Sequence, residues 1–438
     1  MKVLNIFTIS SLFFVFSLLD CHIKSNTDLE KKMVFSFGES GAYGIEVNHS
    51  TIWPYNLNGV KYGVTGKVET SKNYLTSDGS FIFWTEVPEG NYSVQVISGD
   101  ENAPSNITIK AESRRLMVYN KELSAKQIDT VEFVVNVRSA KINESDSIKL
   151  KPREFPYVNW DTNLSLEFGG VHPCVRSVTI TPVSDLPTIF LAGNSTVVDQ
   201  EEEPWASWGQ MFPAFLNKNV VVANFAESGE TLKSFIWEKR FDKIASMIKP
   251  GDFIFMEFAH NDQKPGSGHV EPYSTYDEHL MKFVNLAREN DATPVFVTST
   301  NRRSFDANGN IKNTLEEYPD AMRELAKKED VFLIDLNAMS KKLFEAMGVE
   351  GSKQAFVHYA ANSFPGQNEP IADNTHFSTY GAWQLAKCVA TGIVNSNCEL
   401  KNYLKKDFEA FDPNKPDPVD TWAWPMSIKA STLKPDGN

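Results

Sequence analysis

The chain is poor in positive charge, in cysteine and in long apolar segments. Its 438 residues contain 43 Lys and Arg against 56 Asp and Glu, which gives a formal net charge of −13. Because contacts with phosphate need a basic surface, this balance excludes a nucleic-acid binder that relies on bulk charge, and it disfavours adhesion to anionic lipid. The 41% of hydrophobic and 23% of charged residues are ordinary values that exclude a wholly disordered chain. At roughly 150 residues per domain, the length indicates two or three domains.

One apolar run stands out, and it lies at the start of the chain. Residues 1–19 contain a single Lys followed by VLNIFTISSLFFVFSLL, which predicts a signal peptide over residues 1–21 and therefore export. The Leu three positions before Cys21 resembles a bacterial lipoprotein signal, whereas Asp20 departs from the small residue usual before the lipidated Cys. Lipidation of Cys21 and simple secretion both stay open. We expect a periplasmic, cell-surface or secreted protein that touches a membrane only through such an anchor.

Only four cysteines are present, which is few for an exported chain. Beyond Cys21, two arrangements are open. Either Cys388 and Cys398 pair across one helix end and leave Cys174 free, or all three are buried thiols.

Residues 33–184 show short alternating runs such as FIFWTEV, NYSVQVIS and DTVEFVVNVRS, separated by Gly, Asn, Asp and Pro. This pattern predicts an all-β sandwich. The segment TPVSDLP at 181–187 is typical of a linker. Residues 405–438, rich in Pro, Asp and Trp, indicate an extended C-terminal tail.

Residues 186–404 alternate short buried runs with amphipathic segments, which predicts a three-layer, doubly wound α/β domain with a parallel sheet. The predicted strands are TIFLAG, VVVANFA, DFIFMEFA, TPVFVTST and VFLIDL. The predicted helices cover residues 205–216, 235–248, 273–290, 318–328 and 380–394.

Polar residues follow the first three predicted strands, at the edge of the sheet where α/β proteins bind ligands. Ser195 follows the first strand after a Gly that permits a sharp turn. Gly229 follows the second, where a backbone N–H can approach an anion. His260 and Asn261 follow the third, and the Asn261 amide is a donor of the kind that stabilises an oxyanion. Each signal alone has an ordinary structural explanation, and their order along the chain is what indicates a site.

A carboxylate and an imidazole precede the last predicted helix in the segment Asp373-Asn374-Thr375-His376. Three residues apart, Asp373 can orient the ring of His376 and stabilise it when protonated. Together with Ser195, these two residues have the chemistry of a serine hydrolase triad.

The segments FLAGNST, ANFAESG, FAHNDQ and DNTHFS resemble the SGNH or GDSL hydrolases, and within them the rhamnogalacturonan acetylesterase-like branch. The resemblance covers residues 186–404 and implies a flavodoxin-like hydrolase domain. It also implies that Ser195, Asp373 and His376 are catalytic, and that Ser195, Gly229 and Asn261 form the oxyanion hole. The family's Gly-Asp-Ser is Gly193-Asn194-Ser195 here; Asn keeps a short hydrogen-bonding side chain, so we expect the loop geometry to survive.

The resemblance implies an O-acetylesterase that acts on acetylated polysaccharide, foremost pectic rhamnogalacturonan, with no metal and no cofactor. The N-terminal sandwich resembles galactose-binding-like modules through VPEGNYSVQV. His260, Arg302 and Arg303 are candidate substrate contacts, the two arginines because an acidic polymer needs a local basic cleft. Two alternatives stay open: an esterase or lipase of the same fold with other acyl esters, and a non-catalytic glycan-binding protein. Five tryptophans are candidates for stacking on sugars or for core packing: Trp205, Trp208, Trp237, Trp422 and Trp424.

Overall fold

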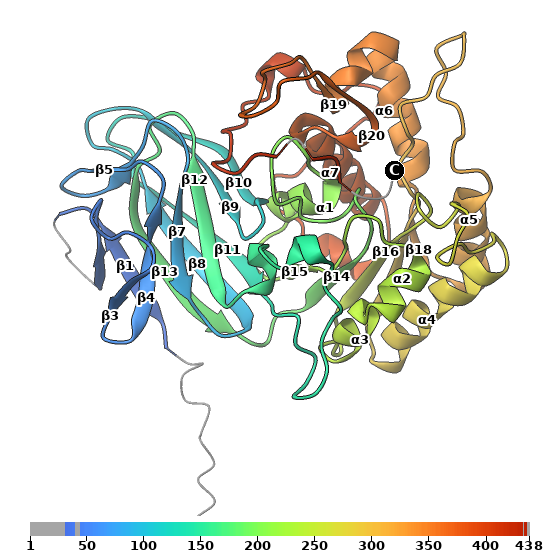
Figure 1. Cartoon of the computed structure of the whole chain (residues 1–438), viewed down its shortest axis with the longest axis horizontal. Coiled ribbons are helices and arrows are strands. Elements are labelled where there is room, and N and C mark those ends of the chain that lie inside the picture. Colours follow the sequence, from blue (N-terminus) through green and yellow to red (C-terminus); the bar gives the residue numbers. More distant parts are fainter. Residues whose placement is uncertain (1–30, 40–43, 432, 436–438) are drawn as a thin grey trace, which may run out of the picture.

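The computed structural model describes residues 31–39, 44–431 and 433–435. The predicted signal peptide and Cys21 lie outside the described residues. A β-rich region and an α/β region lie side by side, and the last part of the chain runs across both (Figure 1).

The β-rich region is a sandwich of two sheets, as the alternating runs predict. In β8 (Gly90–Ser98) every second residue is buried, because alternate side chains of a strand point to opposite faces. The inward side chains of both sheets, among them Phe35, Phe83 and Val94, form one core. The first sheet has the order β11-β8-β13-β1-β2, with β6 on β13 and β5 on β6; the second has the order β10-β9-β12-β7-β4-β3. The strands are β1 (Met33–Phe37), β2 (Ile45–Val47), β3 (Tyr55–Leu57), β4 (Val60–Thr65), β5 (Glu69–Thr70), β6 (Leu75–Thr76), β7 (Phe81–Glu86), β8, β9 (Ser105–Ala111), β10 (Arg115–Leu123), β11 (Asp129–Val137), β12 (Asn163–Gly169) and β13 (Val175–Val183).

The α/β region confirms the predicted doubly wound sheet. Its parallel strands have the order β15-β14-β16-β17-β18. The second strand, β15, lies on one side of β14 and the third, β16, on the other, so the order in which strands are added to the sheet reverses at β14. In flavodoxin-like sheets, ligands bind at the carboxyl ends of the strands at this reversal. The strands are β14 (Thr188–Gly193), β15 (Val221–Asn224), β16 (Phe253–Glu257), β17 (Thr293–Val297) and β18 (Phe332–Ile334).

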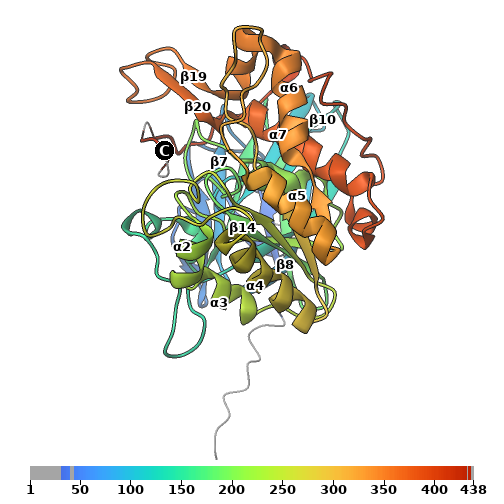
Figure 2. The ribbon, with the colours of Figure 1, turned by 90° about the vertical axis from the view of Figure 1, so that its right-hand side faces the viewer.

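Helices cover both faces of this sheet and complete three layers (Figure 2). Along β14, Ile189 and Leu191 face one helical layer, whereas Phe190 and Ala192 face the other. The first layer contains α1 (Trp208–Met211), α6 (Leu336–Gly351) and α7 (Thr379–Val394); the second contains α2 (Leu232–Trp237), α3 (Arg240–Ala245), α4 (Thr275–Glu289) and α5 (Tyr318–Glu329).

The secondary structure of the α/β region differs from the sequence prediction in three respects. The helix expected over 235–248 is two, because Lys239 adopts a left-handed conformation (φ 66°) between α2 and α3. The segment 205–216 forms only the short α1 followed by a 3₁₀ turn (Phe212–Phe215) that contains Pro213. Helix α6, which Asp335 caps, and the hairpin of β19 (Phe356–Tyr359) and β20 (Ile371–Phe377) were not predicted.

The connection between β11 and β12, residues 138–162, packs on the α/β region, and we call it the connector. Its Ile148 belongs to the core between the sheet and α2–α5. Glu154, in a 3₁₀ turn (Pro152–Glu154), accepts a hydrogen bond of 2.6 Å from Arg240 of α3, and both side chains are fully buried. The sandwich thus extends into the second domain. The linker predicted at 181–187 is shorter in the structure, because β13 continues to Val183 and leaves only residues 184–187 between the two regions.

The C-terminal segment, residues 405–435, crosses both regions as an extended strap whose one short 3₁₀ turn in the described residues is Val419–Thr421. Asp417 pairs with Lys387 of α7 at 2.7 Å. Trp422 then stacks on Tyr119 of β10, with ring centroids 4.5 Å apart. Farther on, the carbonyl of Pro425 accepts a hydrogen bond from Lys110 in the sandwich.

The three cysteines in the described part of the chain are free thiols. These are Cys174, Cys388 and Cys398, so of the two open arrangements the structure has the thiols and not the Cys388–Cys398 pair, with Cys398 only partly buried. Cys388 lies on α7 with its side chain in the core, and burial raises the pKa of Cys174 to about 12. Among the described residues, none of the helices has the length and apolar character needed to cross a membrane.

Candidate active site

Ser195 lies in a tight turn directly after β14. Two residues earlier, at Gly193, the turn has no room for a side chain. A Cβ on Gly193 would come within 2.6 Å of Val197 Cγ2 and 3.1 Å of the Glu257 carbonyl. The buried Asn194 accepts a hydrogen bond from the backbone N–H of Thr196 at 3.1 Å, and the Thr196 hydroxyl oxygen lies 2.9 Å from the same Asn194 Oδ1. Asn at this position therefore shapes the turn through an acceptor oxygen, as expected for the departure from Gly-Asp-Ser.

Ser195, His376 and Asp373 form one hydrogen-bonded chain. The Nε2 atom of His376 lies 3.0 Å from Ser195 Oγ, and its Nδ1 lies 2.8 Å from Asp373 Oδ2. With the proton on Nδ1 donated to the carboxylate, Nε2 is free to accept the hydroxyl proton of Ser195. All three side chains are buried, and Ser195 is only 4% exposed. The geometry therefore brings the three predicted residues together from positions far apart in the chain.

Asp373 and His376 come together through an irregular strand and not through a simple turn. Both lie on β20, where residues three apart would normally point to opposite faces. The pairing of β19 with β20 shifts register between Phe377 and Ala372, which breaks this alternation. Asp373 Oδ1 also accepts the backbone N–H groups of Thr375 and His376, at 2.7 and 2.9 Å.

The carboxyl group of Asp373 is held ionised despite its burial. Desolvation opposes the charge, but the hydrogen bond and the charge of His376, with the two backbone donors, lower the pKa of Asp373 below its ordinary value. The Lys434 ammonium of the C-terminal strap lies 3.4 Å from the same carboxylate. An ionised Asp373 stabilises the imidazolium that forms when His376 takes a proton.

Two further donors lie where the resemblance implies an oxyanion hole. Gly229 sits in a turn with φ 81°, a conformation that favours glycine. In the described part of the chain, the N–H groups of Gly229 and Ser195 donate no hydrogen bond and stay available for a ligand. Asn261 donates one N–H to the Glu230 carbonyl at 3.0 Å, and its Oδ1 accepts from Lys264 at 3.0 Å, which fixes the amide with its second N–H free.

Glu257 lies beneath the nucleophile turn and was missed in the sequence. At the end of β16, it accepts hydrogen bonds from Thr196 Oγ1 at 2.8 Å and from Trp208 Nε1. Burial raises the pKa of Glu257 to about 7. The available signal was a single carboxylate inside the otherwise apolar run FIFMEFA. Glu257 supports the turn that carries Ser195 and does not contact Ser195 itself.

The three predicted substrate contacts, His260, Arg302 and Arg303, lie near the triad and form hydrogen bonds with other groups of the protein. His260 is 2% exposed, and burial lowers its pKa well below the ordinary value. Arg302 donates to the carbonyl oxygens of His260 and Thr314, at 3.2 and 3.0 Å. Arg303 donates to Asn374 Oδ1 at 3.1 Å, next to Asp373. In this state, all three support the loops around the triad, and their contact with substrate stays a prediction.

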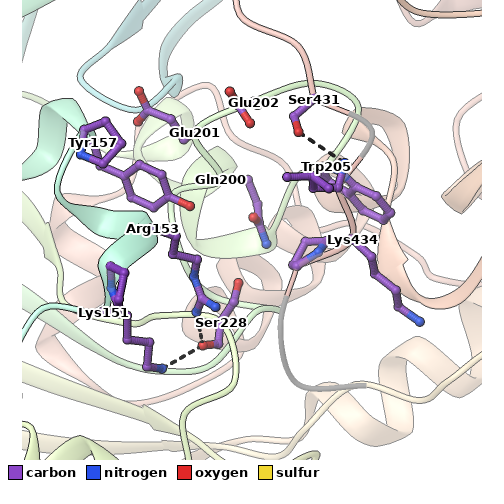
Figure 3. Close-up of a pocket in the computed structure, with 14 residues that line it drawn as sticks. Lys151, Arg153, Tyr157, Gln200, Glu201, Glu202, Trp205, Ser228, Ser431 and Lys434 are labelled. Carbon is purple, nitrogen blue, oxygen red and sulfur yellow. Dashed lines mark hydrogen bonds between the residues drawn. The ribbon is translucent and has the colours of Figure 1, made fainter. Parts of the chain in front are cut away.

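Figure 3 shows a cavity of about 580 Å³, whose lining residues Trp205 and Lys434 contact His376 and Asp373 of the triad. Trp205 on its wall packs edge-on against the His376 ring, with centroids 5.7 Å apart, whereas Trp208 is fully buried in the core. The cations on this wall are Lys151 and Arg153 of the connector and Lys434 of the strap. These residues come from outside the α/β domain, so their part in the cavity was invisible in the sequence pattern.

The fold and the hydrogen-bonded Ser-His-Asp chain define a flavodoxin-like ester hydrolase of the SGNH type. A model of the GDSL-like Lipase/Acylhydrolase family matches residues 191–382. The chain is 49% identical over 218 residues to rhamnogalacturonan acetylesterase RhgT of Bacillus subtilis, which covers 49% of this chain and 93% of that protein. It is 34% identical over 223 residues to the probable rhamnogalacturonan acetylesterase YesY of the same species, which covers 50% of this chain and 98% of YesY.

One solved structure, protein YxiM of Bacillus subtilis, aligns with 85% of this chain and 98% of its own, at 22% identity and a TM-score of 0.44. On the strength of the family match and of the 49% identity to RhgT, the chain belongs to the GDSL-like lipase/acylhydrolase family and is a hydrolase of ester bonds.

Proposed function

We propose that this protein is an exported carbohydrate esterase that removes O-acetyl groups from pectic rhamnogalacturonan by a Ser-His-Asp acyl-enzyme mechanism. The observation that carries the proposal is the continuous chain from Ser195 through His376 to Asp373. It lies in a domain that is 49% identical to a named rhamnogalacturonan acetylesterase.

In the proposed mechanism, Ser195 Oγ attacks the acetyl carbonyl carbon while His376 Nε2 takes the hydroxyl proton. The negative charge that develops on the carbonyl oxygen is held by the N–H groups of Ser195 and Gly229 and by the free N–H of Asn261. The ester C–O bond then breaks, and His376 returns the proton to the sugar oxygen that leaves. His376 Nε2 then takes a proton from water as the water oxygen attacks the acetyl carbonyl; the bond from this carbon to Ser195 Oγ breaks, His376 returns the proton to Oγ, and acetate departs. Apart from this water and the substrate, the steps are carried by the triad and the three donors.

The surroundings of the triad support a small acyl group on a sugar polymer. The adjoining cavity is lined by Tyr157, whose partly exposed ring can pack on a sugar, by the buried Trp205 and by the three cations named above. Glu201 and Glu202 line the same cavity, so a uronate polymer would bind here through individual cations and not through a uniformly basic wall. Export follows from the predicted signal peptide and places the enzyme where such polymers occur.

The test is a panel of substrates with one readout, the acetate released. Acetylated rhamnogalacturonan, xylan and mannan are compared at equal acetyl concentration, together with aryl esters of two, four and eight carbons. We expect rhamnogalacturonan to give the highest kcat/KM among the polymers and the aryl acetate to exceed the longer aryl esters. Preference for the eight-carbon ester would overturn the acetylesterase assignment, and preference for xylan or mannan would overturn the pectic one.

A further inference from the structure

The loop that carries Gly229 is held from outside the hydrolase domain by two cations of the connector. Lys151 Nζ donates to the carbonyl oxygen of Ser228 at 2.9 Å, and Arg153 Nη2 donates to the same oxygen at 2.6 Å (Figure 3). Ser228 is buried. Two charged donors therefore converge on one carbonyl immediately before the oxyanion-hole glycine.

Carboxylates of the same loop lock both cations in place. Arg153 binds Glu227 Oε1 through Nε and Nη2, at 3.2 and 2.8 Å, and Lys151 pairs with Glu230. Glu227 and Glu230 are themselves buried, and Glu227 Oε1 also accepts the N–H of Ser228 at 2.9 Å. Loss of Arg153 would remove the paired cation of the buried Glu227, whereas Glu230 would keep Arg240 Nε at 3.8 Å after loss of Lys151.

The Ser228 carbonyl and the Gly229 N–H belong to one peptide unit. Because this unit is planar and trans, its C=O and N–H point in opposite directions, and fixing one fixes the other. A hydrogen bond to the oxygen also polarises the amide, so its N–H becomes a stronger donor. Donors that carry charge produce the larger effect. Two cations behind the peptide unit thus act on the donor in front of it.

The same loop also reaches Asn261, the side-chain donor of the hole. The carbonyl of Glu230 accepts the hydrogen bond that orients Asn261, and Glu230 is paired with Lys151. The backbone N–H of Glu227 in turn donates to the carbonyl of Gly193, two residues before Ser195. Loop 227–230 therefore links all three oxyanion donors, and the connector anchors it.

We propose that Lys151 and Arg153 are positioning residues of the oxyanion hole, which orient and polarise the Ser228–Gly229 peptide so that the Gly229 N–H stabilises the oxyanion. The inference rests on the acyl-enzyme mechanism proposed above. It assigns the N-terminal region a part in catalysis, since its connector supplies these two side chains.

The test uses the full chain and charge-matched double variants, so that no carboxylate is left unpaired. These are Arg153→Met with Glu227→Gln, and Lys151→Met with Glu230→Gln. With an aryl acetate as substrate, and kcat referred to active sites titrated with an aryl phosphonate, we expect each pair to lower kcat about 10- to 100-fold with KM within twofold. Oxyanion contacts form only in the transition state, which is why KM should not move.

Conservative variants and a matched control separate positioning from simple stability. Arg153→Lys, which keeps a charged donor, should recover most of kcat. Lys239→Met removes a cation that anchors the connector through Asp146 at 2.5 Å, away from Ser228, and should leave kcat within twofold. Binding of phenylboronic acid, whose adduct with Ser195 places an oxygen in the hole, should weaken in proportion to kcat in the double variants.

Three results would overturn the inference. The first is an unchanged kcat in both double variants, and the second is a rise in KM alone. The third is a lower concentration of titrated active sites with an unchanged kcat per titrated site. If one double variant fails to fold, the other and Arg153→Lys still decide the matter. Failure of the mechanism itself is distinguishable, because Ser195→Ala would then retain activity on the same aryl acetate, whereas failure of this inference leaves Ser195→Ala inactive.

Discussion

Two buried carboxylates near Ser195, Asp373 and Asp199, differ in how their partners are built. Asp373 and His376 are three residues apart, and their hydrogen bond of 2.8 Å ends at the Ser195 hydroxyl. Asp199 and Arg115 are 84 residues apart and join the α/β region to β10, with two hydrogen bonds of 2.9 and 3.0 Å. The second pair holds an arginine that joins two regions of the fold, whereas the first holds an imidazole that takes and returns a proton in the proposed mechanism. We infer that the first pair governs rate and the second governs stability.

The largest expected effect tests the first half of this contrast. Asp373→Asn should lower kcat on an aryl acetate by about 10⁴-fold, because an Asn in this place favours the wrong tautomer of the histidine and does not stabilise its cation. The measurement is steady-state kinetics on protein checked for a native circular dichroism spectrum. A loss smaller than tenfold would remove Asp373 from the proposed mechanism.

The same chemical change in the second pair should have the opposite signature. Asp199→Asn leaves the fully buried guanidinium of Arg115 without its counter-charge, which costs roughly 3–5 kcal/mol of unfolding free energy. Urea unfolding of this variant beside the wild type measures the cost, and kcat of the folded fraction should stay within a few-fold. Unchanged stability with a large fall in kcat would erase the distinction between the two pairs.

Glu257 provides a third, smaller comparison, since its hydrogen-bond donors, Thr196 and Trp208, are neutral. Burial raises the pKa of Glu257 from 4.5 to about 7, so the folded state binds a proton that the unfolded state releases between these values. Stability should therefore fall as pH rises through this range. An increase from 4.5 to about 7 corresponds to roughly 3 kcal/mol.

The variant Glu257→Gln removes this titration and keeps the shape of the side chain. The difference in unfolding free energy between the variant and the wild type should change in favour of the variant from pH 4.5 to 7 and level off above about 8. Urea titrations across this range measure it. A difference that is independent of pH, or that changes in favour of the wild type, contradicts the assigned burial of this carboxyl group.

The sequence was sufficient where a signal is local. Short apolar runs predicted all five strands of the parallel sheet, because buried parallel strands are continuously apolar. The turn residues after them, with Asp373 and His376, indicated the triad. The break at Lys239 escaped because nothing in an amphipathic pattern marks a single left-handed residue.

The contacts between the regions could not be predicted for a different reason. Lys151 and Ser228 are 77 residues apart, and Arg115 and Asp199 lie in different domains. Charged residues in an isolated segment are most simply explained by solvent exposure, and only the assembled fold shows Arg115 as 1% exposed. The sequence therefore indicated Arg302 and Arg303, directly after a strand, as the basic residues of the cleft. The cavity wall takes its cations from the connector and the strap.

The central claim is that Ser195 is the nucleophile of a pectic acetylesterase. Its most direct test is acetate release from acetylated rhamnogalacturonan by the wild type and by Ser195→Ala at equal concentration of folded protein. We predict release by the wild type and a fall of at least about 10⁴-fold in the variant. Acetate release by Ser195→Ala at a rate close to that of the wild type would contradict the account.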